Sequence, residues 1–566
     1  MKRRAFAQWH RFVSCLAALL LLSPLVAQAQ TAPVVPGAGT ILQQVQPVAP
    51  PAPSTTEPGL KIEREGGAKL PPSAPFEVKT IRITGNTLFA TATLHALVMD
   101  AEGKSLTLTQ LDELAKRITD YYHSHGYPLA RAIIPAQTIR DGVVQIEVIE
   151  ARYGKVSLAN KSRVNDALLK ATLAPLQSGQ AIARAPLDHA LLLLSDIPGV
   201  AVDATLKPGA AVGTSDLVVQ AAPGPAVSGN VTLDNYGDRY TGRVRAGATV
   251  NDYDPLHHGD VLSASGISSG AGMNYGRIGY DTLLNGDGTR LGASYSALHY
   301  ILGGALAALN AHGTADVASA SVRQPLVRSR TANLYGEIGY DRLQLRDHID
   351  ASAIRTDRHL DNWHATLSGD ARDALGAGGI NSWSLVWTAG RVNFDDSAAQ
   401  LADAATANTQ GSFSKWNASF TRLQTLNANN ALYLAVFGQW ANGNLDASQK
   451  MIAGGPYSVR AYDMGAVSGD SGYLGTAEWR HALGRAWQGQ WQAVAFVDSA
   501  HVTVNKTTWA PGANSATLSG AGLGLDWAGQ NLWSARAYVA ARIGSTPVLV
   551  ASTNSARAWV EISKGF

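Results

Sequence analysis

The stretch RVRAGATV, residues 243–250, alternates between two kinds of side chain with a period of two. Aliphatic side chains occupy one face and arginine or threonine the other: Val244, Ala246, Ala248 and Val250 against Arg243, Arg245 and Thr249. Successive side chains of a β-strand point to opposite faces, so this stretch predicts a strand with one apolar and one charged surface. A membrane-spanning barrel strand has two such surfaces, one toward lipid and one toward the lumen.

The alternation recurs to the end of the chain, and RAYVAARI (residues 536–543) again places arginine and tyrosine opposite aliphatic residues. After Pro225 no helical period is visible, and short alternating runs are separated by loops rich in Gly, Asn and Asp. At roughly 20 residues for each strand with its connection, residues 225–566 predict an all-β, antiparallel transmembrane barrel of about 16 strands. The terminal Phe566 fits a last strand that ends in an aromatic residue.

Composition agrees with an exported barrel. Charged residues make up 16% of the chain, against about 25% in ordinary soluble domains, and mean hydropathy is only −0.04. A basic start, an apolar run and the A-x-A sequence Ala27-Gln28-Ala29 predict a signal peptide at residues 1–29. Its four basic residues, taken from the formal charge of +3, leave −1, and no basic tract in the rest suggests nucleic acid. The one cysteine, Cys15, lies in this leader, which excludes cysteine chemistry in the mature chain.

Residues 30–75 are rich in proline, alanine and threonine, which is typical of an extended linker. Inside this segment, GTILQQVQP predicts a short helix at residues 39–46, ended by Pro47. A helical island before a long linker predicts a mobile plug that occupies the barrel lumen at rest and can leave it.

Residues 76–224 contain two consecutive units of the order β-α-α-β-β, at 76–151 and 152–224. In the first, TLTQLDELAKRITDYYHSHG predicts a helix, with Thr109 and Asp112 as its capping box. Two units of this size predict two small α+β domains ahead of the barrel rather than one enzyme core.

GGPYSVRAYDMG, residues 454–465, is a glycine-rich loop that carries a single arginine, Arg460. Downstream, the alternation of residues 490–502 directs Phe496 and Asp498 into the lumen. A loop that folds back into the barrel would bring Arg460 to Asp498, where a bidentate ion pair is strong. Glu478 also faces inward and is the rival partner, ranked second because Arg480 lies on the same face and can satisfy it.

The whole chain resembles the TpsB transporters of two-partner secretion, the hemolysin secretion and activation family, which is related to BamA. The family's V-R-G-Y/F loop motif is matched by Val459, Arg460, Ala461 and Tyr462, and its F-x-D motif by Phe496 and Asp498. Ala461 stands where the family has glycine, which would strain the loop if that position needs a positive φ. GYPLARAIIPAQTIRDGVVQIEVIEARYG and LLLLSDIPGVAVDATLKPG are similar to parts of the family's two POTRA domains.

The resemblance implies an outer-membrane translocator, with periplasmic POTRA domains, that secretes a large β-helical exoprotein bearing an N-terminal secretion domain. It implies no catalytic residue, metal or cofactor; the other expected partners are outer-membrane lipid, lipopolysaccharide and the barrel assembly machinery. Cargo capture by strand addition or in a helix–strand groove suggests a candidate surface on the first POTRA domain: Leu111, Leu114, Ile118, Leu129, Arg131 and Ile133. For the helical residues of this set, a place in the domain core is the stronger interpretation.

Other readings are weaker. Gly266-Ile267-Ser268-Ser269-Gly270 matches the G-x-S-x-G nucleophile elbow of serine hydrolases, but that motif needs a helix after it and the next residues alternate like a strand. His123 with His125, and His257 with His258, are expected to be surface histidines rather than metal ligands. A BamA-like assembly factor is the main alternative function; two POTRA units and a proline-rich segment favour secretion.

Overall fold

The computed structural model describes residues 35–45, 59–63, 73–551 and 554–566. The predicted signal peptide and most of the proline-rich segment therefore lie outside the described residues. In the described part of the chain, no helix is both long and apolar enough to cross a membrane.

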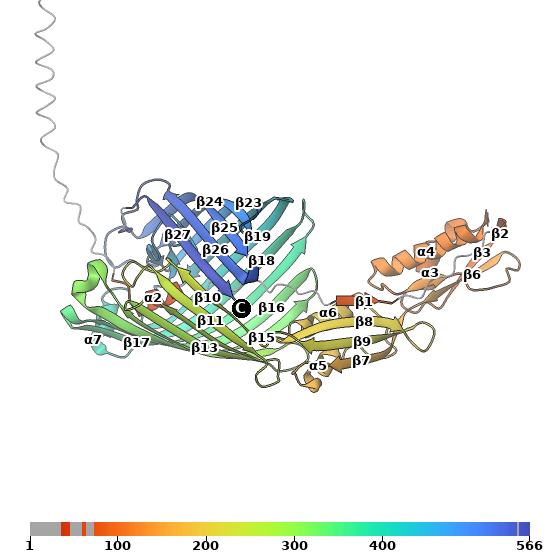
Figure 1. The fold of residues 1–566 in the computed structure, drawn as a ribbon, viewed down its shortest axis with the longest axis horizontal. Helices are drawn as coiled ribbons and strands as arrows, with labels where there is room; N and C mark the ends of the chain where they lie inside the picture. The colour runs from red at the N-terminus through yellow and green to blue at the C-terminus, as the bar shows by residue number, and fades with distance from the viewer. Residues whose placement is uncertain (1–34, 46–58, 64–72, 552–553) are drawn as a thin grey trace, which may run out of the picture. The chain divides into compact units, whose positions relative to one another are not determined.

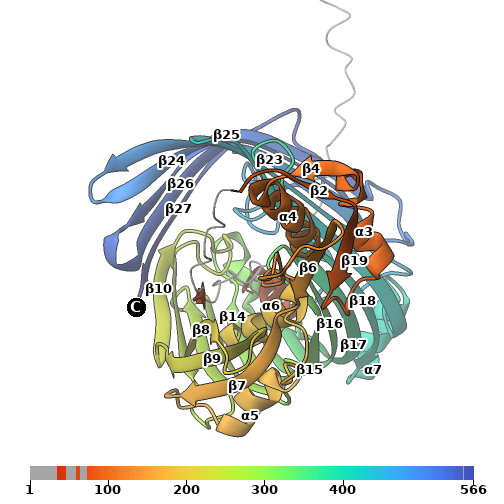
Figure 2. The same ribbon diagram turned by 90° about the vertical axis from the view of Figure 1, so that its right-hand side faces the viewer.

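Sixteen antiparallel strands form a closed barrel, which confirms the predicted fold (Figures 1 and 2). The ring closes because the first strand, β10, pairs with both β11 and the last strand, β27. The sixteen strands are β10 (Val227–Asp234), β11 (Arg245–Tyr253), β12 (Val261–Ser268), β13 (Met273–Leu283), β14 (Arg290–Ile301), β15 (Ala311–Arg328), β16 (Ala332–Ile349), β17 (Ile354–Asp373), β18 (Gly379–Phe394), β19 (Gly411–Asn427), β20 (Asn430–Ala441), β23 (Ser471–Ala486), β24 (Gly489–Thr503), β25 (Ser515–Gly529), β26 (Trp533–Arg542) and β27 (Ala556–Gly565).

The two faces of the barrel wall follow the sequence alternation. Val244 and Val250 are 62% and 42% exposed, whereas Arg245, between them, is buried and pairs with Asp234. Exposed aliphatic and aromatic side chains recur along the other strands as well, as a lipid-facing surface requires. Arginine therefore lies on the inner face.

The longest connections, residues 395–410, 442–470, 504–514 and 543–555, lie at the end of the barrel opposite to the one where residue 227 enters. The long connections include the helix α7 (Ser397–Ala404) and residues 442–470, which carry the small hairpin of β21 (Met451–Ala453) and β22 (Val467–Gly469). Short 3-10 helices occur in three of the other connections: η2 (Gly304–Leu309), η3 (Asp350–Ser352) and η4 (Gln530–Leu532).

The first α/β unit packs the helix α4 (Leu108–Ser124) on a sheet of order β3-β6-β5. The helix begins at Thr107, whose hydroxyl accepts from the backbone of Gln110 while the Gln110 side chain accepts from Thr107 N–H. The predicted cap at Thr109 and Asp112 was therefore wrong by two residues: the same S/T-x-x-E/Q pattern, with glutamine as its last member, starts earlier. The elements are β2 (Phe76–Val78), β3 (Thr80–Thr84), α3 (Thr91–His95), η1 (Met99–Ala101), β4 (Lys104–Leu106), α4, β5 (Arg131–Ile133) and β6 (Val143–Ile149).

The second α/β unit has the order β7 (Arg152–Asn160), α5 (Asp166–Leu173), α6 (Arg184–Ser195), β8 (Val200–Pro208) and β9 (Thr214–Pro223). Its sheet contains one strand more than expected, in the order β1-β8-β9-β7. The extra strand, β1 (Gly59–Ile62), comes from the proline-rich segment and pairs in parallel with β8. The prediction of a linker thus fails at these four residues, because their backbone pairs with the otherwise free edge of β8.

Candidate functional site: a loop and a helix inside the barrel

Residues 442–470 fold into the barrel, and Arg460 anchors them to the inner wall. Its Nε and Nη2 atoms donate to the two carboxylate oxygens of Asp498 at 2.9 and 2.8 Å, and its backbone N–H donates to Asp498 Oδ2 at 3.1 Å. Both side chains are almost completely buried. The structure thus brings together the loop arginine and the wall aspartate named from the sequence.

Glu478 is a second partner of Arg460 and not a rival. Arg460 Nη1 donates to Glu478 Oε1 at 2.7 Å, while Arg480 binds the other oxygen, Oε2, at 2.7 Å. The Thr476 hydroxyl accepts from Arg460 Nη2 at 3.0 Å. The expectation that Arg480 alone would satisfy Glu478 was wrong, because each carboxylate has two oxygens and the two arginines take one each. Two cations and two anions thereby balance at this site.

Aromatic side chains complete the environment of Arg460. Its guanidinium carbon lies 3.4 Å from the centre of the Phe496 ring, which is cation–π contact. Trp559, on the last barrel strand, donates its indole N–H to the Arg460 carbonyl at 2.7 Å. Tyr462 is 2% exposed and lies in the same buried apolar cluster as Phe496. The loop motif and the wall motif therefore meet at one point.

Ala461 fits because its neighbour on the wall is Gly520. Ala461 is not among the residues with a positive φ, so the expected backbone strain does not arise. It is fully buried, and a Cβ added to Gly520 would stand 2.4 Å from the Ala461 Cβ. The methyl group of the loop occupies the space that a side chain at position 520 would need.

A second anchor, which the sequence analysis missed, holds the loop near the closing seam of the barrel. Asp463 accepts from Arg243 at 2.8 Å and also from Arg557, while Arg239 lies 4.0 Å away. Arg243 precedes β11 and Arg557 lies in β27, on the two sides of β10. The inward direction of Arg243 was visible in the alternation, but its partner was not.

The predicted plug helix is present as α2 (Ala38–Val45), among the barrel strands (Figure 1). Its first N–H group donates to Asp347 of β16 at 2.6 Å, and Gln43 donates to the carbonyl of Ser448 in the loop at 2.7 Å. Gly39 permits this close approach, because a Cβ there would stand 2.6 Å from the Ser448 nitrogen. The helix therefore rests on both the wall and the folded-in loop.

Buried charges connect the two supports of α2. Arg358 donates to Asp347 at 2.8 Å and to Asp446 of the loop at 2.5 Å. Asp446 accepts in turn from the backbone of Ser448, the residue that receives Gln43. Helix, wall and loop form one hydrogen-bonded unit, which no local sequence pattern reveals.

The candidate surface on the first α/β unit needs a correction. Leu111, Leu114 and Ile118 are at most 4% exposed and belong to the core, so they offer no surface to cargo. Their stripe packs onto the sheet, as the amphipathic helical period equally allowed. The remaining candidates lie on or beside β5, which is an edge strand: Arg131 is exposed, and Leu129 and Ile133 are partly buried.

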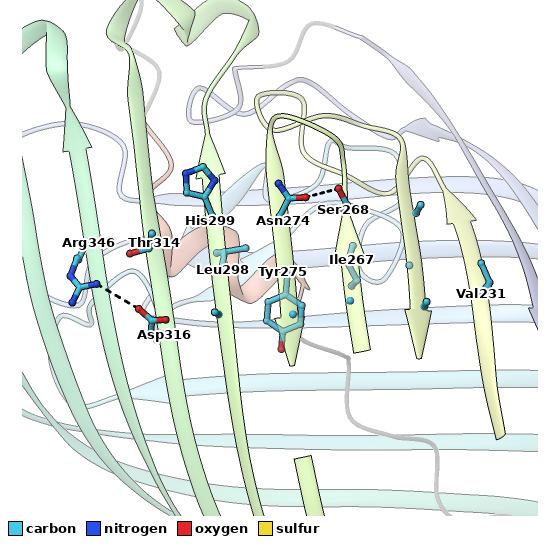
Figure 3. A pocket seen from close by; sticks show the side chains of 16 residues that line it. Val231, Ile267, Ser268, Asn274, Tyr275, Leu298, His299, Thr314, Asp316 and Arg346 are labelled. Carbon is cyan, nitrogen blue, oxygen red and sulfur yellow. Dashed lines mark hydrogen bonds and ion pairs between the residues drawn. The ribbon is translucent and has the colours of Figure 1, made fainter. Parts of the chain in front are cut away.

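The serine motif forms a hairpin. Ser268 ends β12 and donates to Asn274 of β13 at 2.6 Å, as Figure 3 shows. Asn274 and His299 are exposed, whereas Tyr275 and Leu298, next to them in sequence, are buried toward the opposite face of the wall. A shallow hollow of about 810 Å³ lies on the barrel wall along strands β10 to β16. A nucleophile elbow needs a helix after the serine, and β13 follows here instead.

The histidine pairs named above make local bonds: His123 contacts the carbonyl of Ala130, and His257 contacts Asp254. Among the residues that the structure describes, no group of three or more His, Cys, Asp or Glu side chains is arranged to hold a metal ion.

A 16-stranded barrel that follows small α/β units and holds a loop and a helix inside it has the architecture of an outer-membrane barrel protein with periplasmic domains. The model of the haemolysin secretion/activation proteins ShlB/FhaC/HecB matches residues 213–527, more than half of the chain, and the ShlB-type POTRA domain model matches 76–151. The chain belongs to this family of two-partner secretion transporters. It lies in the outer membrane, with its POTRA domains in the periplasm.

Individual relatives agree. The heme/hemopexin transporter protein HuxB of Haemophilus influenzae (strain 86-028NP) is 28% identical over 445 residues, 78% of each chain. The structure of CdiB from Escherichia coli has a TM-score of 0.69 at 21% identity, over 89% of this chain and 92% of that one. BamA from Haemophilus ducreyi, lacking POTRA domains 1–3, has a TM-score of 0.53 at 15% identity, over 87% and 100%. The two structures are similar in fold.

Proposed function

We propose that this transporter binds a large, unfolded exoprotein in the periplasm and passes it through the barrel once α2 has left the lumen. Residues 76–151 and 152–224 act as the two POTRA domains that receive it, and residues 225–566 form the conduit. The observation that carries the proposal is that a helix and a loop inside the barrel are held by hydrogen bonds and ion pairs, which can break and re-form without a covalent step.

The proposed cargo is a β-helical exoprotein with an N-terminal secretion domain. Its capture needs no sequence-specific pocket, because an extended chain can add to a sheet edge through main-chain hydrogen bonds. The edge strand β5, with Arg131 exposed beside Ile133, is one such place on the first POTRA domain. Lipopolysaccharide and lipid surround the barrel in this proposal, and the barrel assembly machinery inserts it.

Deleting the gene tests the proposal. We expect one large exported protein to disappear from the culture medium and to return when the gene is restored on a plasmid. Mass spectrometry of the medium identifies this protein, and the abundance of outer-membrane porins in the same cells serves as the control. A medium that keeps all its proteins while the porins decrease would contradict the proposal and favour a BamA-like assembly factor.

A further inference from the structure

Strand β1 covers the outer edge of the second POTRA sheet. Four residues pair in parallel with β8, from Gly59 opposite Asp203 to Ile62 opposite Leu206, and Glu63 N–H adds a hydrogen bond to the Leu206 carbonyl at 3.0 Å. Leu60 and Ile62 pack against the domain core, while the side chain between them faces solvent. The edge of β8 therefore accepts an extended segment with apolar residues at alternate positions.

This cover is small. Parallel pairing is slightly less stable per residue than antiparallel pairing, and β1 has four residues. Both of its apolar side chains remain partly exposed. Without β1, β8 would present a row of unpaired N–H and C=O groups, which is a template for any extended chain. A longer segment with the same alternation would make more hydrogen bonds to this edge and could replace β1.

Replacement of β1 would change how far α2 can move, because β1 lies between α2 and the first POTRA domain in the chain. Thirteen residues, 46–58, join α2 to β1, and nine more, 64–72, join Glu63 to the first POTRA domain. While β1 stays paired, the segment between it and α2 can extend to roughly 45 Å. When β1 is released, the 27 residues 46–72 can extend to roughly 95 Å. Loss of the β1–β8 pairing thus gives α2 about twice the reach.

We propose that the β8 edge is a docking site for an extended segment of the exoprotein, and that β1 covers this edge until the exoprotein displaces it. The inference rests on the proposed function and adds to it where the cargo binds and how binding is linked to the release of α2. The segment that docks carries Leu, Ile or Val at alternate positions, like Leu60 and Ile62, and a small residue opposite Asp203. Gly59 holds that place at rest, and a Cβ there would stand 2.6 Å from Asp203 Oδ1.

A disulfide between β1 and β8 tests the proposal in the full-length transporter. Lys61 and Thr205 are register partners, and both side chains point away from the core. Neighbouring strands lie about 4.8 Å apart, which is within the Cα–Cα range of a disulfide, so we choose Lys61→Cys with Thr205→Cys. We expect the oxidised variant to stop secreting the exoprotein found by gene deletion, and a reductant to restore secretion. Secretion at the wild-type level by the fully oxidised variant would overturn the proposal.

The matched control is Ser157→Cys with Val218→Cys. This pair is also in parallel register, between β7 and β9 of the same sheet, but it leaves β8 free to exchange its neighbour. We expect it to secrete equally when oxidised and when reduced. If it is blocked as well, the sheet only needs to be flexible, and the docking proposal fails.

A further experiment distinguishes docking at β8 from an effect of the disulfide on the reach of α2. The Lys61→Cys, Thr205→Cys pair is placed in a chain that lacks residues 36–45, so that no plug helix remains to be held. Continued inhibition by oxidation supports docking at β8. Recovery of secretion in this chain shows that the disulfide acted only through α2 and overturns the docking site. Neither outcome bears on the proposed function, which the gene deletion tests by itself.

A peptide provides a measurement that does not depend on the exoprotein. The probe is residues 57–64, EPGLKIER, labelled with fluorescein. Leu60→Asp with Ile62→Asp in the transporter should release β1 and open the edge, so the peptide should bind this variant in detergent far better than the wild type by fluorescence anisotropy. The same peptide with both apolar residues replaced by Asp should bind neither protein. Equal binding to wild type and variant would contradict an exchangeable edge.

Discussion

The guanidinium of Arg460 donates hydrogen bonds to both Asp498 and Glu478, so Arg460 and Asp498 do not behave as a simple pair. We expect Arg460→Ala to be the most harmful single change, because it leaves two buried carboxylates facing each other; removing one member of a buried ion pair costs roughly 3–5 kcal/mol. Asp498→Ala should be milder, since Glu478 still holds the arginine. Secretion, together with trypsin cleavage of the loop in intact cells, measures both effects with the barrel still inserted.

The double mutant of Arg460 and Asp498 should be little worse than Arg460→Ala alone, because the two losses share one interaction. Exchange of the two residues should not restore function, since an aspartate at position 460 would face Glu478. Fully additive losses would show that Arg460 and Asp498 do not act as a pair. Complete rescue by the exchange would show that Glu478 is not a working partner of Arg460.

Ala461 and Gly520 form a steric pair on the same scale. Gly520→Ala should displace the loop, because its Cβ would lie 2.4 Å from that of Ala461. Adding Ala461→Gly should restore secretion by removing the opposing methyl group. Overpacking of a well-packed core typically costs about 1–3 kcal/mol, so we expect a partial loss in the single mutant and near-normal secretion in the double mutant. Ala461→Gly alone is the control, and a double mutant as poor as Gly520→Ala would disprove the pairing.

At the scale of elements, β11 offers a direct test of which face meets lipid. Spin labels at Ala246 and Ala248 should show the collision rates with oxygen typical of a bilayer, because these side chains are exposed on the outer face. A label at Thr249, which lies on the opposite face of the same strand, should report water. The reverse pattern would mean a register shifted by one residue, which turns every side chain to the other face.

The junction between Glu150, which follows β6, and the backbone of Thr87 and Leu88 should respond to pH. Burial alone would raise the pKa of Glu150, but hydrogen bonds from Thr87, Leu88 and Tyr122 outweigh it and lower the pKa below the ordinary glutamate value. A lowered pKa in the folded state stabilises the domain above the unfolded pKa, and this stabilisation is lost as pH falls through the folded pKa.

Glu150→Gln should therefore loosen the junction at neutral pH by about 1.5–3 kcal/mol, the size of hydrogen bonds to a charged group. Hydrogen exchange at Thr87 and Leu88, compared between variant and wild type at matched pH, measures the change. The difference should shrink as pH falls through the lowered pKa of Glu150 in the folded state, because the wild-type carboxylate then becomes protonated. A difference that stays constant with pH would assign the effect to packing rather than charge.

At the scale of the whole molecule, α2 and the folded-in loop contact each other and the inner wall, and we expect them together to restrict the lumen. Removing residues 36–45 should raise the single-channel conductance in planar bilayers while the barrel remains folded. Gly39→Val should act in the same direction without a deletion, because its side chain would collide with the Ser448 backbone. Gln43→Ala, which removes one hydrogen bond, should have a smaller effect. Unchanged conductance in the deletion would remove the plug from the proposed function.

Much of this architecture follows from local patterns. A side-chain period of two is a property of the extended backbone itself, so the alternation at Arg243–Val250 was enough to predict a strand and both of its faces. The helical island at 39–46 is likewise local, and it appears as α2 with a boundary one residue earlier. The lone arginine at 460 and the inward aspartate at 498 could be named because the alternation selects few inward carboxylates.

Only the tertiary structure decided which distant groups meet. The stripe of Leu111, Leu114 and Ile118 predicts a helix with an apolar face, but whether that face covers a core or receives cargo depends on the sheet packed against it. The link from Asp347 through Arg358 to Asp446 joins residues far apart in the chain. Strand β1 is four residues long in a proline-rich segment, and its structure comes from hydrogen bonds to β8, about 140 residues away. Pairings of this kind depend on where the folded chain leaves a backbone edge open, which no local period encodes.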